Sequence, residues 1–290
     1  METLYFKPKT LEEALALLNQ YKTDILIVNG GTDAVLSIVE KKVFPAAILQ
    51  VSELPGFHEI TVAENKVRIG GGVTYNEMLA SPLLAGYKGL REAILHLASP
   101  AIRALGTPAG NICTAAPAAD GAAMLYALEA EVCLESIEGI RNVPLRDFYV
   151  TTSSYSTVRK PEELLTAIEI PVLKDGDGTG YCRLSRRKAQ DIGKVLTGAY
   201  LTMTDGRVSH ASISLGALNA TLVHAAELEK ALIGKTGGEA VSYVRATYPV
   251  EAKLHKSSFT AYKQDVICPA VARAVEMAVT SAEGGQSWSK

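Results

Sequence analysis

The sequence is poor in cysteine, and the few cysteines that it has are scattered. They stand at Cys113, Cys133, Cys182 and Cys268, with no CxxC pair among them. Metal and iron–sulfur sites need clustered thiolates, and small disulfide scaffolds need cysteines in a regular framework. We therefore expect that this chain ligates no metal and has no disulfide framework.

An excess of one charge and a long apolar run are also missing. The 290 residues include 29 Lys and Arg against 31 Asp and Glu, so the net charge is −2. Proteins that bind nucleic acid or an anionic membrane usually carry a basic surplus. No run approaches the roughly 18 apolar residues of a spanning helix, and the N-terminus has no signal-peptide core. We expect a soluble, cytoplasmic protein that binds neither nucleic acid nor membrane.

Several well-known catalytic and nucleotide-binding motifs are absent. The chain has no GxGxxG, GxSxG or HExxH, and "IGKT" (Ile233–Thr236) lacks the earlier glycine of a phosphate-binding loop. The lone His96 is typical of a structural residue, so we name no catalytic residue. The carboxylate pairs Glu12–Glu13 and Glu162–Glu163 are typical of solvated helix faces.

Hydrophobic residues make up 48% of the chain, enough for a sizeable core. Apolar spacing and a capping box predict a helix over Thr10–Tyr21, and "DILIVN", "AVLSIVEKK" and "AAILQV" continue a β-α-β pattern with parallel strands. A hairpin is expected at Glu64–Asn65, followed by helices at Tyr75–Ala85 and Leu90–Ala98.

The second half of the chain predicts strands first and helices last. Strands are expected at "EVCLES", "LLTAIEIPV" and "GYCRLSR", and two long strands should join at Asp205–Gly206. The last 70 or so residues are typical of helices. Because Lys174–Gly180 is typical of a flexible loop, we place a domain boundary at about 171–180.

Two glycine-rich stretches are the most informative. In "VNGGTDAV" an apolar strand meets Gly30–Gly31 and then Thr32, a fair helix N-cap. This pattern indicates either a plain turn or a nest of backbone N–H groups that holds a phosphate. About 75 residues later, "SPAIRALGTPAGNICTAAPAAD" again carries glycines next to Thr and Asn before a helix. If the two stretches converge, their N–H groups suit a diphosphate.

Both stretches resemble the FAD diphosphate loops of the flavin subunits of molybdenum hydroxylases, the family of xanthine, carbon monoxide and nicotinate dehydrogenases. "RLSRRKAQDIGKV" is similar to a later Arg-x-Ala-x-Asp-Ile signature, and "SSFTAYKQDV" to a C-terminal run in which Thr260 replaces a common arginine. One departure is "TPAGN", where relatives usually have Thr, an apolar residue and then Gly-Gly-Asn.

The resemblance implies an α+β fold with two domains. Residues 1–175 would form the FAD-binding region of the vanillyl-alcohol-oxidase (PCMH) type, in two subdomains of about 1–55 and 56–175. Residues 176–290 would form a smaller C-terminal domain, a three-stranded antiparallel sheet with helices.

The resemblance also implies which residues bind FAD. Asp120 matches an acidic residue at the ribityl side, although it is also a candidate helix cap. Arg183 falls where relatives place a lysine near the flavin ring, although it is also a candidate surface residue, and Leu97 falls where some have a ring-packing aromatic. The expected FAD-binding residues are Val28, Asn29, Gly30, Gly31, Thr32, Asp33, Ala34, Leu97, Gly106, Thr107, Gly110, Asn111, Thr114, Asp120 and Arg183.

The function implied is that of an electron-transfer subunit. A molybdopterin-binding large subunit would oxidise the organic substrate, and a [2Fe–2S] small subunit would pass electrons to FAD and on to an acceptor such as NAD. Two alternatives stay open: a self-sufficient FAD-dependent reductase of the same fold superfamily, and a scaffold with a degraded flavin site.

Overall fold

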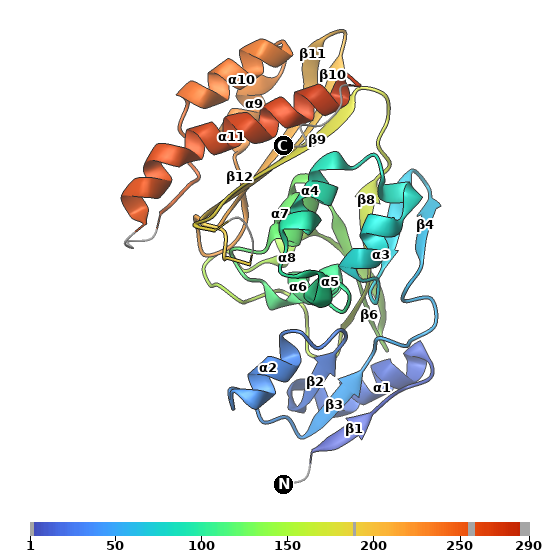
Figure 1. The fold of residues 1–290 in the computed structure, drawn as a ribbon. Helices are drawn as coiled ribbons and strands as arrows, with labels where there is room; N and C mark the ends of the chain where they lie inside the picture. Colours follow the sequence, from blue (N-terminus) through green and yellow to red (C-terminus); the bar gives the residue numbers. More distant parts are fainter. Residues whose placement is uncertain (1–2, 188–189, 255–258, 285–290) are drawn as a thin grey trace.

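The computed structural model describes residues 3–187, 190–254 and 259–284, which form three sheets with flanking helices. Figure 1 shows the three parts stacked along the long axis of the molecule, with the first sheet at one end and the last at the other. None of the described helices is long and apolar enough to cross a bilayer.

The first part is a parallel three-stranded sheet in the order β1-β3-β2. Its strands and helices are β1 (Leu4–Phe6), α1 (Leu11–Tyr21), the short 3₁₀ helix η1 (Lys22–Asp24), β2 (Ile25–Val28), α2 (Ala34–Val39) and β3 (Ala47–Gln50). Thr10 caps α1 by accepting the Glu13 N–H, as the capping pattern predicted. Because β2 is an edge strand, its outer backbone faces away from the sheet.

The second part is an antiparallel five-stranded sheet in the order β4-β5-β8-β6-β7. Its strands are β4 (Ile60–Ala63), β5 (Lys66–Gly70), β6 (Glu131–Ser136), β7 (Gly139–Pro144) and β8 (Leu164–Pro171). Its helices are α3 (Tyr75–Ala80), η2 (Pro82–Leu84), α4 (Lys88–His96), α5 (Pro100–Arg103), α6 (Pro108–Thr114), α7 (Asp120–Ala127) and α8 (Leu145–Phe148). Every residue of α7 is buried, so this helix lies in the core.

The third part is an antiparallel sheet in the order β12-β11-β10-β9, with the long helix α11 across it (Figure 1). Its elements are β9 (Asp177–Leu184), β10 (Val195–Thr204), β11 (Arg207–Gly216), β12 (Val223–His224), α9 (Ala226–Leu232), α10 (Gly237–Ala246) and α11 (Thr260–Ala282). The expected three strands are present, and the two-residue β12 adds a fourth at the edge. Ser257 and Ser258 of the "SSFTAYKQDV" run lie outside the described residues.

Several sequence expectations are corrected. Asp177–Gly180, expected in a loop, starts β9 because it pairs with β10. Glu163 does not lie on a solvated helix face: it is 4% exposed, and the Arg141 guanidinium donates to both of its carboxylate oxygens at 2.6 and 2.9 Å. Both features depend on partners distant in sequence. The Glu64–Asn65 hairpin is confirmed, with both residues at positive φ.

β9 joins the third part to the second, and this junction positions the site described below. The Gly89 N–H of α4 donates to Thr179 Oγ1 at 2.9 Å. The Tyr181 hydroxyl donates to Asp120 Oδ1, at the start of α7, at 2.7 Å. The third part is therefore anchored at the first residue of the buried helix.

Candidate functional site

A cavity of about 1460 Å³ is lined by described residues from four stretches of the chain, 22–51, 75–120, 155–187 and 190–192. Both glycine-rich stretches open onto it. Thirteen of the expected residues line it, namely Asn29, Gly30, Gly31, Thr32, Asp33, Ala34, Leu97, Gly106, Thr107, Gly110, Asn111, Thr114 and Asp120. Val28 and Arg183 are not among its lining residues.

The first glycine stretch leaves β2 in a tight turn, with Gly31 at φ +73°. At Gly30 the constraint is a close approach: an added Cβ would lie 1.7 Å from the Leu105 carbonyl oxygen of the second stretch. The expected Thr32 cap is wrong, since α2 begins one residue later with Asp33 as its N-cap residue and no side-chain cap bond. Gly30 thus brings the two loops into backbone contact.

The turn leaves a row of backbone donors unused. Within the described residues, the N–H groups of Gly30, Gly31, Thr32, Asp33 and Ala34 make no hydrogen bond to the protein. Polar groups of this kind need a partner when water is displaced from them. Five consecutive N–H groups at the start of a helix favour an anion.

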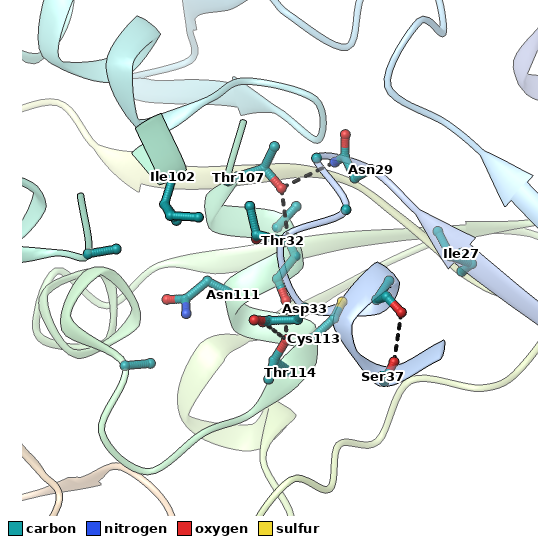
Figure 2. Close-up of a pocket in the computed structure, with 18 of the residues that line it drawn as sticks. Ile27, Asn29, Thr32, Asp33, Ser37, Ile102, Thr107, Asn111, Cys113 and Thr114 are labelled. Carbon is teal, nitrogen blue, oxygen red and sulfur yellow. Dashed lines mark hydrogen bonds between the residues drawn. The ribbon is translucent and has the colours of Figure 1, made fainter. Parts of the chain in front are cut away.

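The second glycine stretch forms the start of α6 and is bonded to the first. Thr107, which is 5% exposed, caps α6 by accepting the Gly110 N–H at 3.0 Å. Its oxygen also accepts from Asn29 Nδ2 at 3.2 Å, and Thr114 Oγ1 lies 3.0 Å from Asp33 Oδ2. Figure 2 shows these bonds running from Asn29 through Thr107, and from Asp33 to Thr114. The two loops are therefore held together at both ends.

The unusual "TPAGN" sequence fits a helix start. Pro108 is the first residue of α6, where a missing N–H costs nothing and the fixed φ suits a helix. Ala109 lies within α6 and does not have a positive φ, so it needs no glycine-like conformation. The departure from the usual Gly-Gly-Asn leaves this loop unstrained.

Asp120 is a buried carboxylate at the end of the cavity. Besides its bond from Tyr181, its Oδ1 lies 2.8 Å from Nε of Arg183, whose side chain is 2% exposed. Burial raises the pKa of Asp120, and the Tyr181 hydroxyl and the Arg183 guanidinium offset part of that rise. The N-cap position of α7 belongs to Ala119, so Asp120 does not cap this helix.

Arg183 holds a second segment of the cavity wall. Its Nη1 donates to Ser185 Oγ at 2.8 Å, and its Nη2 donates to the Asp191 carbonyl oxygen. The Asp191 carboxylate in turn accepts the Arg186 N–H at 2.9 Å. The Arg183 side chain is thus buried behind the wall, where it is bonded to Ser185 and Asp191.

Comparisons with known proteins agree on one family. Residues 1–173 match the family described as FAD binding domain in molybdopterin dehydrogenase, and residues 180–278 match the CO dehydrogenase flavoprotein C-terminal domain. The chain belongs to the FAD-binding subunits of the molybdenum hydroxylase family.

Two relatives and one solved structure illustrate the match. The nicotinate dehydrogenase FAD-subunit of Eubacterium barkeri is 32% identical over 235 residues, 79% of each chain. The carbon monoxide dehydrogenase medium chain of Afipia carboxidovorans is 33% identical over 231 residues, also 79% of each. A chain of reconstituted CO dehydrogenase from Oligotropha carboxidovorans superposes with a TM-score of 0.87 at 29% identity, covering 97% of this chain and 99% of that one.

The cavity fits the FAD of this family. The row of unused N–H groups at residues 30–34 suits the diphosphate. Because Gly30 has no side chain, the backbones of the two loops approach closely and no Cβ stands between them and the diphosphate.

Several residues of the wall were not among those expected from the sequence, because nothing in their residue type marks them and only the fold brings them to the cavity. Those residues include Ile25, Leu26, Ile27, Tyr75, Cys113, Tyr155, Arg159, Arg186, Arg187 and Ile192. Lys188 and Ala189 of the "RRKAQDI" signature lie outside the described residues.

Proposed function

We propose that this FAD-binding subunit transfers electrons within a heteromeric molybdenum hydroxylase. It would receive electrons from a [2Fe–2S] small subunit and deliver them through FAD to an acceptor such as NAD, while a molybdopterin-binding large subunit oxidises the organic substrate. Relatives named as a FAD-subunit and medium chains support such an assembly. Bound FAD would supply the chemistry, since it can accept electrons singly and release them in pairs.

The row of unused N–H groups at residues 30–34 carries the proposal for the site. These donors would hold the diphosphate, with Asn29 and Thr107 locking the second loop against the first. The positive end of α2 and the charge-assisted hydrogen bonds would favour a doubly charged group there.

At the other end of the cavity, Asp120 and Leu97 would face the ribityl and ring portions. Arg183 would act on that end through Asp120, because its side chain does not line the cavity. The domain boundary proposed near residue 175 places Asp120 and Arg183 on opposite sides of it. A cytoplasmic location is also part of the proposal, supported by the four free thiols.

The experiment separates a subunit from a self-sufficient reductase. The chain is expressed alone, loaded with FAD, and mixed anaerobically with NADH, with and without organic acceptors, while flavin absorbance is followed. We expect flavin bands but no turnover of an organic substrate by the lone chain; oxidation of that substrate should begin only when the large and small subunits are added with NAD as the electron acceptor. Sustained oxidation of NADH by an organic acceptor with the lone chain would favour the reductase, and failure to take up FAD would favour the degraded scaffold.

A further inference from the structure

Tyr75 lies directly behind the second glycine loop and is bonded to it at two points. It is the first residue of α3, is 2% exposed and forms part of the cavity wall. Its backbone N–H donates to the Gly106 carbonyl oxygen at 3.0 Å, and its hydroxyl donates to Asn111 Oδ1 at 3.0 Å. One residue therefore fixes both the start of this loop and a side chain within α6.

The hydroxyl has little freedom to move. A Cβ added to Gly121, next to Asp120, would lie 2.4 Å from the Tyr75 oxygen, so the hydroxyl is confined between α6 and α7. Burial raises the pKa of Tyr75, and the nearby Asp120 and Asp33 carboxylates raise it further. The hydroxyl keeps its proton at all ordinary pH values, and it is a standing donor to Asn111.

This donor decides which end of the Asn111 carboxamide faces the cavity. With Oδ1 engaged by Tyr75, the Nδ2 group has no hydrogen bond to any described residue. It is not among the buried atoms that lack a partner, so it is open to the cavity. Figure 2 shows the Asn111 side chain set apart from the bonded Asp33 and Thr114. An amide nitrogen donates two hydrogen bonds, and both remain available to a ligand.

We propose that Tyr75 is a positioning residue for the cofactor: its hydroxyl holds Asn111 so that Nδ2 donates to an acceptor oxygen on the diphosphate–ribityl part of FAD. The inference rests on the proposed function, because it requires that FAD fill this cavity. Without the hydroxyl, the carboxamide is free to rotate and to present its oxygen to the phosphates. That orientation sets a lone pair against negative oxygens and loses the hydrogen bond.

The test compares two tyrosines that differ in what their hydroxyls hold. Tyr75→Phe keeps the ring and loses the bond to Asn111. Tyr87→Phe is the matched control, since the Tyr87 hydroxyl, on a 3% exposed residue, donates to the Pro171 carbonyl oxygen at 2.6 Å and does not line the cavity. Apoprotein is titrated with FAD by flavin fluorescence, and its melting temperature is recorded without FAD.

We expect both variants to lose similar thermal stability, because each loses one buried hydrogen bond. Only Tyr75→Phe should bind FAD more weakly, by about five- to tenfold. A double-mutant cycle with Asn111→Ala should show that Tyr75→Phe adds no further loss once Asn111 is removed. Equal FAD affinity in Tyr75→Phe and wild type, or a penalty that persists in full without Asn111, would overturn the inference.

Asn111→Asp covers the case in which Tyr75→Phe does not fold. Aspartate still accepts from the Tyr75 hydroxyl but has no Nδ2 donor, so FAD affinity should fall more than tenfold; wild-type affinity would refute the role. Repeating the titrations with ADP and FMN locates the acceptor, on the diphosphate if ADP carries the penalty and on the ribityl side if FMN alone does. A wild-type protein that binds no FAD would instead count against the proposed function.

Discussion

Gly30→Ala tests how closely the two glycine loops must approach. The added methyl carbon would lie 1.7 Å from the Leu105 carbonyl oxygen and 2.5 Å from its carbon. Ordinary contacts are roughly 3.5–4 Å, so the loops would have to separate by about 2 Å. The obstacle is backbone rather than a flexible side chain, and overpacking of this kind costs about 1–3 kcal/mol. Because the N–H row at residues 30–34 would move away from α6, we expect FAD affinity to fall more than about tenfold, or about 1.4 kcal/mol.

The controls separate loop displacement from backbone strain. Gly56 has φ +76° with no atom within 4 Å of an added Cβ, so Gly56→Ala adds strain of about 1–2 kcal/mol without a clash. It should lower the apoprotein melting temperature by a few degrees and leave FAD affinity unchanged. The assays are fluorescence titration with FAD and thermal melting without it. If Gly30→Ala bound FAD within about twofold of wild type, the close approach of the loops would be irrelevant to cofactor binding.

Three further predictions concern charge and conformation. Asp120→Asn keeps an acceptor for Tyr181 but leaves the buried Arg183 guanidinium unpaired, so apoprotein stability in urea should fall by about 3–5 kcal/mol; unchanged stability would contradict the pairing. Ala109→Gly should cost about 1 kcal/mol in α6 and change FAD affinity by less than about tenfold, since Ala109 is helical; a larger gain in affinity would show that the native loop is strained. One ring nitrogen of His58 lies 3.0 Å from a Glu77 carboxylate oxygen, and the other lies 2.7 Å from the Ser52 carbonyl oxygen. Burial lowers the pKa of His58, but these two acceptors outweigh burial, so the pKa is raised above 6.5. The stabilisation of the fold by protonated His58 is therefore full below about pH 6.5 and is lost as the pH rises through the raised pKa of His58. Because the His58–Glu77 pair is so exposed, the loss should be less than about 1 kcal/mol. His58→Gln should remove this pH dependence from thermal melts.

Much of the local structure could be predicted because its signal is local. The Thr10 cap, the Glu64–Asn65 turn and the parallel β2–β3 pair follow from residues close together in the chain. The start of β9 and the burial of Glu163 could not, because they depend on β10 and on Arg141. The sequence alone does not show that a carboxylate such as Glu163 is buried, because its partner Arg141 is 22 residues away.

The site was predictable to the extent that glycine marks it. Gly30 and Gly31 indicate a turn, and the resemblance of the stretch to an FAD diphosphate loop favours a nest of N–H groups over a plain turn. Tyr75 carries no such signal, since an aromatic residue at the start of an amphipathic helix is typical of a core position. Tyr75 and Asn111 are 36 residues apart in the chain. The bonds of Tyr75 to Gly106 and Asn111 therefore form only when the fold brings α3 to the second glycine loop.

Arg183 links the core helix α7 to residues that follow β9. The resemblance predicts a cation near the flavin ring, and in the structure the guanidinium is buried and contacts Asp120, Ser185 and Asp191. Placed there, the guanidinium offsets part of the rise that burial causes in the pKa of Asp120, and it donates to Ser185 and Asp191. The strand that supplies Arg183 and Tyr181 belongs to the third part of the molecule, whereas Asp120 begins the core helix of the second. The contacts of Tyr181 and Arg183 with Asp120 therefore form only when the C-terminal sheet packs against α7.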